Sequence, residues 1–123
     1  MTNVQDGCVL HVTRETRPLR IGDSVTIGHK ATLHGCTLRE LCLIGIGAIV
    51  LDGSVVESYS MVAAGAVVTP NSVVDEGTLV GGIPAKPLRR LTEAEMADLP
   101  ASAERYYAYS RRAAASAADR RQA

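Results

Sequence analysis

Residues 43–82 decide the fold and read LIGIGAIVLDGSVVESYSMVAAGAVVTPNSVVDEGTLVGG. Every sixth residue is aliphatic, in the series Ile44, Val50, Val56, Val62, Val68, Val74 and Val80. A small residue stands four positions after each of the first six, in the series Ala48, Ser54, Ser60, Ala66, Ser72 and Thr78. Neither an amphipathic helix nor a half-buried strand has a period of six, whereas a coil of short strands joined by tight turns does.

The same register continues upstream with two interruptions. The aliphatic positions are Val4, Leu10, Ile21, Ile27, Leu33 and Leu38. The long step from Leu10 to Ile21 predicts a short excursion, and the step from Leu33 to Leu38 is one residue short. We therefore expect a mainly β fold, a single-stranded parallel β-helix with about eighteen residues in each triangular coil. Each strand points its aliphatic residue into a narrow core.

The composition excludes several functional classes. The chain of 123 residues has no Trp and no Phe, so small aliphatic side chains must fill the core. Residues 1–82 carry five basic and eight acidic side chains, and residues 83–123 carry eight basic and five acidic, so minus three is balanced by plus three. Neither value suggests a nucleic-acid or membrane surface, and no apolar run approaches the length of a bilayer span.

Cysteine usage predicts the compartment. Cys8, Cys36 and Cys42 cannot all pair within one chain, and the opening MTNVQDG is unlike a signal peptide. We therefore expect a reducing, cytoplasmic setting. Cys8 and Cys42 occupy the small inward position of the repeat, where Cys acts as a compact apolar residue, and no cysteine has zinc-finger spacing.

The repeat predicts two regions, a β-helix over residues 1–84 and an exit segment with C-terminal α-helix over residues 85–123. The exit reads GGIPAKPLRRL, over residues 81–91. We expect the C-terminal region to pack on the β-helix or on a neighbouring subunit.

Local signals place the C-terminal helices. Thr92 and Glu95 form a capping-box pattern that predicts a short helix, and Pro100 is expected to end it. Ser102 is expected to cap a second, longer helix. Its predicted packing face carries Tyr106, Tyr109 and Ala113.

All three histidines fall near one part of the repeat. The stretch IGHKATLHG, residues 27–35, holds His29 and His34, and His11 lies in VLHVT. His11 and His34 each follow an inward aliphatic residue on the same face of adjacent coils, so both point outward and can share one metal ion. His29 points outward around a corner, where a neighbouring subunit in a three-fold assembly could use it. The alternative is that all three are ordinary surface residues.

The sequence resembles a known family. The repeat resembles the hexapeptide-repeat proteins, which implies a left-handed β-helix, although the general rule for parallel crossovers favours the right-handed form. The segments NVQDGCVLHV, IGHKATLHGC and LIGIGAIVLDGSVV resemble the γ-class carbonic anhydrases and their relatives from carnitine and phenylacetate operons. This resemblance implies a homotrimer with a metal site between subunits.

The resemblance also implies the roles of individual residues. His11 and His34 of one chain and His29 of the next would bind Zn²⁺, with Fe²⁺ or Co²⁺ as other options. Gln5 would lie near the metal-bound water and bicarbonate, and Asp6 in the polar network at the interface. Both also fit plain turn chemistry, since Asp before Gly is common in turns.

The implied activity is that of a lyase. A metal held by three imidazoles lowers the pKa of its bound water to about 7, so that metal-bound hydroxide attacks carbon dioxide and gives bicarbonate in a reversible hydration. Some family members carry a glutamate proton shuttle on a long loop. Here the excursion TRETRPLR, residues 13–20, is short and its only acid is Glu15. A dedicated shuttle is therefore not expected.

The chain departs from the family at its start. Family members begin several tens of residues earlier, with coils that carry an Arg-Gly-Asp segment. Met1 lies within the repeat here, so we expect those coils to be missing, through a true truncation or a wrongly assigned start. The first coil would then present an unpaired edge.

Two alternatives to the anhydrase remain open. One is a hexapeptide acyltransferase that uses an acyl-CoA and a histidine as general base. The other is a structural or assembly subunit with weak or no catalysis. The exit motif does not decide between the anhydrase and the acyltransferase, whereas the three histidines favour the anhydrase.

Overall fold

The protein is a stack of short strands followed by one long helix, as seen in a computed structural model that describes residues 1–12 and 16–122. The strands are β1 (Asn3–Val4), β2 (Val9–His11), β3 (Arg20–Ile21), β4 (Thr26–Ile27), β5 (Thr32–His34), β6 (Thr37–Leu38), β7 (Leu43–Ile44), β8 (Ile49–Val50), β9 (Val55–Val56), β10 (Met61–Val62), β11 (Val67–Val68), β12 (Val73–Val74), β13 (Thr78–Gly81) and β14 (Lys86–Arg90). The helix is α1 (Glu93–Gln122).

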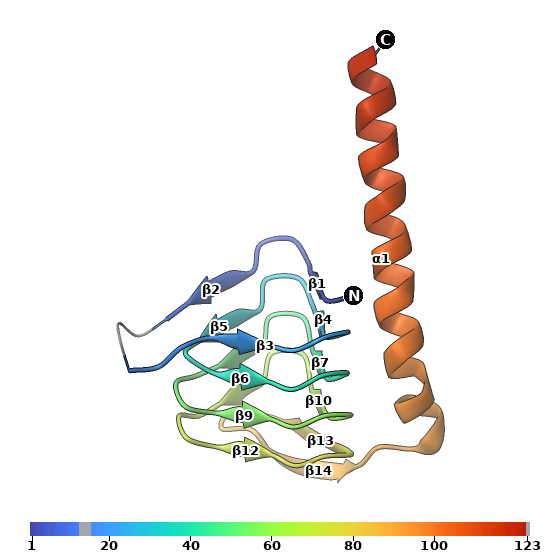
Figure 1. The fold of residues 1–123 in the computed structure, drawn as a ribbon. Coiled ribbons are helices and arrows are strands. Elements are labelled where there is room, and N and C mark those ends of the chain that lie inside the picture. The colour runs from blue at the N-terminus through green and yellow to red at the C-terminus, as the bar shows by residue number, and fades with distance from the viewer. Residues whose placement is uncertain (13–15, 123) are drawn as a thin grey trace.

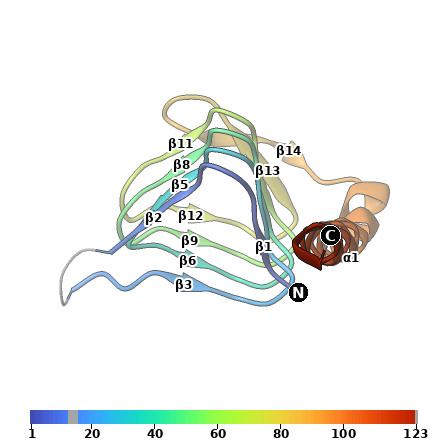
Figure 2. The ribbon, with the colours of Figure 1, turned by 90° about the horizontal axis from the view of Figure 1, so that it is seen from above.

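The strands form the three faces of a triangular prism. The first sheet has the order β1-β4-β7-β10-β13-β14, the second β11-β8-β5-β2 and the third β12-β9-β6-β3. All pairings are parallel except that of β13 with β14, so each coil lies directly on the next. Seen from the end that carries β1, the chain runs counter-clockwise as it recedes, so the coil is left-handed (Figure 2). The predicted fold class is confirmed.

The predicted aliphatic series forms the core. The inward residues of the second and later coils are buried, including Ile27, Leu33 and Leu38 with at most 1% of their surface exposed. Burial of each such side chain stabilises the fold by about 1.5–3 kcal/mol. Val4 and Leu10, which take the same inward positions in the first coil, are 47% and 40% exposed. The inward residues are therefore fully shielded from solvent only from the second coil onward.

The corners of the prism need a left-handed backbone conformation. Gly47 and Gly77 take it with φ of 70° and 71°, and Lys30 and Leu41 take it at the equivalent turns of other coils with φ of 58° and 59°. Glycine adopts this conformation without steric cost, whereas other residues pay for it. Glycine recurs at the turns of the repeat for this reason.

The exit segment contains a strand that the sequence did not predict. β14 pairs antiparallel with β13 and extends the first sheet by one strand. Leu91 N then donates to Gly77 O at 2.8 Å, which ties the end of the hairpin to the last coil. The hairpin therefore covers the C-terminal edge of the first sheet.

The capping box is confirmed, because Glu95 N donates to Thr92 Oγ1 at 3.1 Å and Thr92 N donates to Glu95 Oε1 at 2.9 Å. The predicted break at Pro100 is wrong, since α1 runs through it without interruption. The proline removes one helical hydrogen bond and costs about 3 kcal/mol. Leu99 and Ala103 are buried on either side of it, which holds both parts in one helix. Figure 2 shows the first turns displaced from the axis of the long part.

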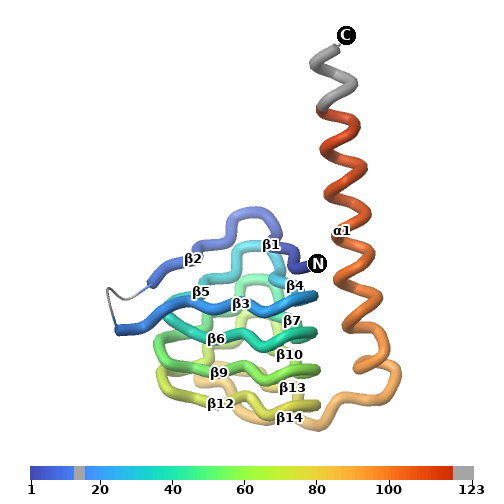
Figure 3. The backbone as a smooth tube through the Cα atoms, viewed as in Figure 1, coloured from blue at the N-terminus to red at the C-terminus, as the bar shows by residue number. Residues whose placement is uncertain are grey.

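The helix packs on the first sheet and then runs past the first coil (Figures 1 and 3). It contacts β1 and β4, and among the helix side chains that the structure describes, those of Leu99, Ser102 and Ala103 are buried. Tyr106 is partly buried, whereas Tyr109 is exposed, so only the first part of the predicted face is covered. Within the described residues, no helix combines the length and the apolar character that a membrane crossing requires.

Because the coils stack closely, two Gly→Ala changes at the same corner of the prism should lower the free energy of unfolding by different amounts. A Cβ on Gly22 would lie 2.8 Å from the Glu40 backbone nitrogen, whereas one on Gly77 would meet only the end of the Arg90 side chain at 3.2 Å. We expect Gly77→Ala to cost about 1 kcal/mol through its positive φ. Gly22→Ala should cost about 3 kcal/mol, because two coils must separate. Urea unfolding of both variants measures the difference, and equal costs would contradict close stacking as the cause.

Candidate metal centre

His11 and His34 lie one above the other on the second sheet. β2 pairs with β5 so that His11 stands opposite His34, as the repeat predicted. The rings are stacked with centroids 4.7 Å apart, and His11 Nδ1 lies 2.8 Å from His34 Nε2. His11 is exposed and His34 is partly buried. Two imidazole nitrogens that face each other at the surface are suited to share a cation.

Asp52 is a third member of this corner that sequence reasoning missed. Its Oδ1 accepts a hydrogen bond from His34 Nδ1. His34 stands one position after the inward Leu33, whereas Asp52 stands two positions after the inward Val50, so counting forward from the preceding strand does not align them. Counted backward from the next inward residue, His34 stands four before Leu38 and Asp52 four before Val56. The residue missing between Leu33 and Leu38 causes this offset, and backward counting would have found the pair.

His29 lies at a different corner of the prism. It is exposed in the turn after β4, and it lines a pocket with Gln5, Ser102 and Tyr106. Gln5 is held by the ladder, with its N–H donating to Ile27 O at 3.0 Å, and its side-chain amide donates to Asn3 Oδ1 at 3.3 Å. The structure thus places Gln5 with His29 and not with the stacked histidine pair of the same chain.

Asp6 occupies an exposed turn beside this pocket. Its backbone carbonyl accepts a hydrogen bond from Lys30 N at 2.9 Å, so the residue helps to stack the first turn on the second. Glu15, the only acid of the excursion, lies outside the described residues.

Among the side chains that the structure describes, no group of three or more His, Cys, Asp or Glu within one chain could hold a metal. A complete three-histidine site therefore requires a second chain.

The buried cysteines are unsuited to metal binding. Cys36 and Cys42 are both 1% exposed, and burial raises their thiol pKa to about 11 and about 12. Cys36, which the sequence left unassigned, fills the small inward position before Leu38. Cys8 is partly exposed, and its Sγ donates to Gly28 O at 3.1 Å. These thiols pack in or against the core.

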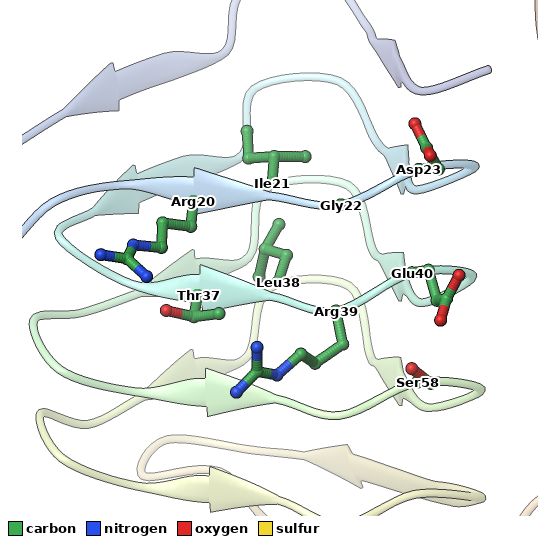
Figure 4. A pocket seen from close by; sticks show the side chains of 9 residues that line it. All are labelled: Arg20, Ile21, Gly22, Asp23, Thr37, Leu38, Arg39, Glu40 and Ser58. Atoms are coloured by element: carbon green, nitrogen blue, oxygen red, sulfur yellow. The ribbon is translucent and has the colours of Figure 1, made fainter.

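A separate pocket lies on the third sheet (Figure 4). Arg20 and Arg39 extend over the strands, while Asp23 and Glu40 lie along the adjoining corner. Arg39 pairs with Glu57 at 3.8 Å. The pocket contains no histidine and lies on a face other than that of His11 and His34, so it is not part of the candidate metal centre.

Known proteins resemble this chain closely. No protein-family model matches it. Over 110 residues it is 47% identical to a protein named "Gamma carbonic anhydrase 1, mitochondrial" from Arabidopsis thaliana, and over 111 residues it is 45% identical to "Protein YrdA" from Escherichia coli, with 85% of the chain covered in both cases. A crystal structure of a hexapeptide transferase family protein from Anaplasma phagocytophilum superposes on 89% of the chain, with 46% identity and a TM-score of 0.85.

The chain belongs to the γ-carbonic anhydrase-like hexapeptide-repeat proteins. It spans 40% of the Arabidopsis relative, 60% of the Escherichia coli relative and 64% of the Anaplasma chain. The resemblance read from the sequence is thereby confirmed at the level of the family.

Thiol reactivity tests the assignment of the cysteines. At pH 8 the thiols of Cys36 and Cys42 remain protonated, because their pKa values lie well above that pH. We expect neither to be alkylated by iodoacetamide until denaturant is added, as read by peptide mass spectrometry. Rapid labelling of either thiol in folded protein would show that it is accessible and would reopen a thiolate site.

Proposed function

We propose that the protein is a metal-dependent carbonic anhydrase of the γ type, with its site shared between protomers of a homotrimer. The observation that supports this most directly is the pair of imidazole nitrogens of His11 and His34, 2.8 Å apart on adjacent coils. In this proposal His29 of a neighbouring protomer completes the ligand set. The 47% identity to a protein named as a γ-carbonic anhydrase supports the same reading.

The donor set fits a zinc ion. Tetrahedral zinc with Zn–N bonds of about 2.0–2.1 Å separates two ligand nitrogens by about 3.3 Å. The observed 2.8 Å needs a small outward rotation of one ring, and His11 is exposed enough to make it. Fe²⁺ and Co²⁺ accept the same imidazole ligands.

The metal would supply Lewis acidity, lowering the pKa of a coordinated water to about 7 so that carbon dioxide is hydrated near neutral pH. The side chains of the chain would orient the reactants. Gln5 shares a pocket with His29, so its amide would reach the same site from the neighbouring protomer. An amide both donates and accepts, which suits it to hold water and bicarbonate. Asp6 would support the site through its backbone carbonyl, which accepts a hydrogen bond from Lys30 N in the turn that also holds His29.

The outer surface supports a trimer. Val9, Ile49 and Val67 take the outward positions of the second sheet, on the face that carries His11 and His34. Val9 is 54% exposed, and Ile46, one coil beyond His29 at its corner, is 57% exposed. Docking this corner onto the second sheet of a neighbour would bury apolar surface while it brings His29 to the histidine pair. The first sheet is already covered by α1.

An acyltransferase is the second candidate, favoured by one observation. His34 is hydrogen-bonded to a carboxylate and is partly exposed, as a general base requires. We expect no release of CoA from acetyl-CoA with amine or hydroxyl acceptors, because His11 occupies the space before His34 Nε2.

An assembly subunit is the third candidate and would bind metal without hydrating carbon dioxide. The cytoplasm remains the predicted compartment.

Subunit mixing tests the shared site. His29→Ala and His34→Ala should each abolish zinc binding, which is expected at about one ion per chain in wild type. When the two variants are unfolded together and refolded, about one quarter of the interfaces would combine an intact His29 with an intact histidine pair. We expect zinc content and carbon dioxide hydration, followed by stopped-flow indicator, to return to about that fraction.

The control for this experiment is each variant refolded alone, which should stay inactive. Failure of the mixture to regain zinc, with mixed trimers demonstrated by native mass spectrometry, would contradict a site shared in this way. Zinc without hydration would favour the assembly subunit.

A further inference from the structure

Asp52 is positioned by the backbone ladder at the same corner as His34. It lies in the turn after β8, and its carbonyl accepts a hydrogen bond from Asn71 N at 2.8 Å. The next residue, Gly53, donates through its N–H to Gly35 O at 2.8 Å. These bonds join successive coils, so the carboxylate is held beside His34 by the stacking of the prism.

A glycine makes room for this contact. A Cβ on Gly35 would lie 2.5 Å from Asp52 Oδ1, so the carboxylate occupies the space that a side chain at position 35 would take. The two partners are each about one third exposed, at 32% for His34 and 34% for Asp52. Solvent therefore reaches the His34–Asp52 pair from one side, while the backbone at Gly35 lies close to Asp52 on the other.

The contact decides which nitrogen of His34 carries the proton. A carboxylate only accepts hydrogen bonds, so His34 Nδ1 must be the donor. In the neutral ring the proton is then on Nδ1, and Nε2 presents its lone pair. Nε2 is the atom that faces His11 Nδ1 at 2.8 Å. The lone pair of His34 is therefore directed at the point between the two rings.

We propose that Asp52 is a positioning residue that holds His34 in the Nδ1–H tautomer, with Nε2 aimed at the shared metal. The proposal rests on the proposed function for the identity of the ligand, a divalent cation. Carboxylates that accept from a ligating histidine orient the ring and raise its basicity in metal sites generally. Counted forward from Val50, Asp52 is only a turn residue before glycine, so the forward pattern gives it no role beside His34.

The test combines a readout without metal and one with metal. Asp52→Asn keeps the shape and the turn chemistry, yet its amide can also donate, so it no longer imposes one tautomer. In metal-free trimer at pH 8, ¹⁵N NMR of the imidazoles should show His34 protonated at Nδ1 in wild type and a mixture of tautomers in the variant. Zinc affinity, measured by competition with a chelating dye, should fall about ten- to hundredfold.

Asp23→Asn is the matched control. It removes the same charge from a turn at another corner of the prism, and it should change neither the tautomer nor the affinity. Asp52→Ala serves as a second variant if Asp52→Asn does not assemble, with the same expected direction. Circular dichroism and native mass establish that each variant is folded and trimeric.

The outcomes separate this proposal from the proposed function. An unchanged tautomer in Asp52→Asn would overturn the proposal whatever the zinc affinity. A shifted tautomer with unchanged affinity would also overturn it, because the contact would not serve the metal. Wild-type trimer that binds no zinc would overturn the proposed function itself, and that measurement is independent of the variants. A shifted tautomer together with weaker zinc binding supports the role.

Discussion

The parallel backbone ladder that stacks each coil on the next is the constraint on which the rest of the structure depends. Because strands lie about 4.8 Å apart along the prism, residues at equivalent positions form columns. The inward columns are aliphatic and make the core, with Leu33 and Val50 buried completely. The corner columns bring polar residues from distant parts of the sequence into contact. His11, His34 and Asp52 form such a column, although 41 positions separate the first from the last.

The ladder also explains why one chain cannot bring its three histidines together. A column runs along one corner and cannot cross to another, so His29 does not reach His11 and His34 within its own chain. The three histidines can meet only if a corner of one prism lies against the face of another. The exposed apolar residues Val9 and Ile46 lie on that face and at that corner. In the proposed trimer, assembly and metal binding would therefore stabilise each other.

Several features of the protein were readable from the sequence. A strict period of six predicts the coils, because no helix or simple strand repeats at that interval. The position directly after an inward residue predicts that His11 and His34 point outward. Thr92 and Glu95 predict the start of the helix through local hydrogen bonds that need no tertiary contact. The break expected at Pro100 was wrong because burial of Leu99 and Ala103 on the first sheet outweighs the local preference of proline.

The sequence by itself determined the repeat, the inward core, the family and the face that carries two of the histidines, because each follows from spacing along the chain. Only the tertiary structure decided that β14 extends the first sheet, that Gln5 lies with His29, and that Asp52 contacts His34. The physical reason is that hydrogen bonds between distant segments, and not the local sequence, place these residues side by side. For Asp52, the residue missing between Leu33 and Leu38 also shifts the forward count, so that only the count backward from the next strand brings Asp52 level with His34.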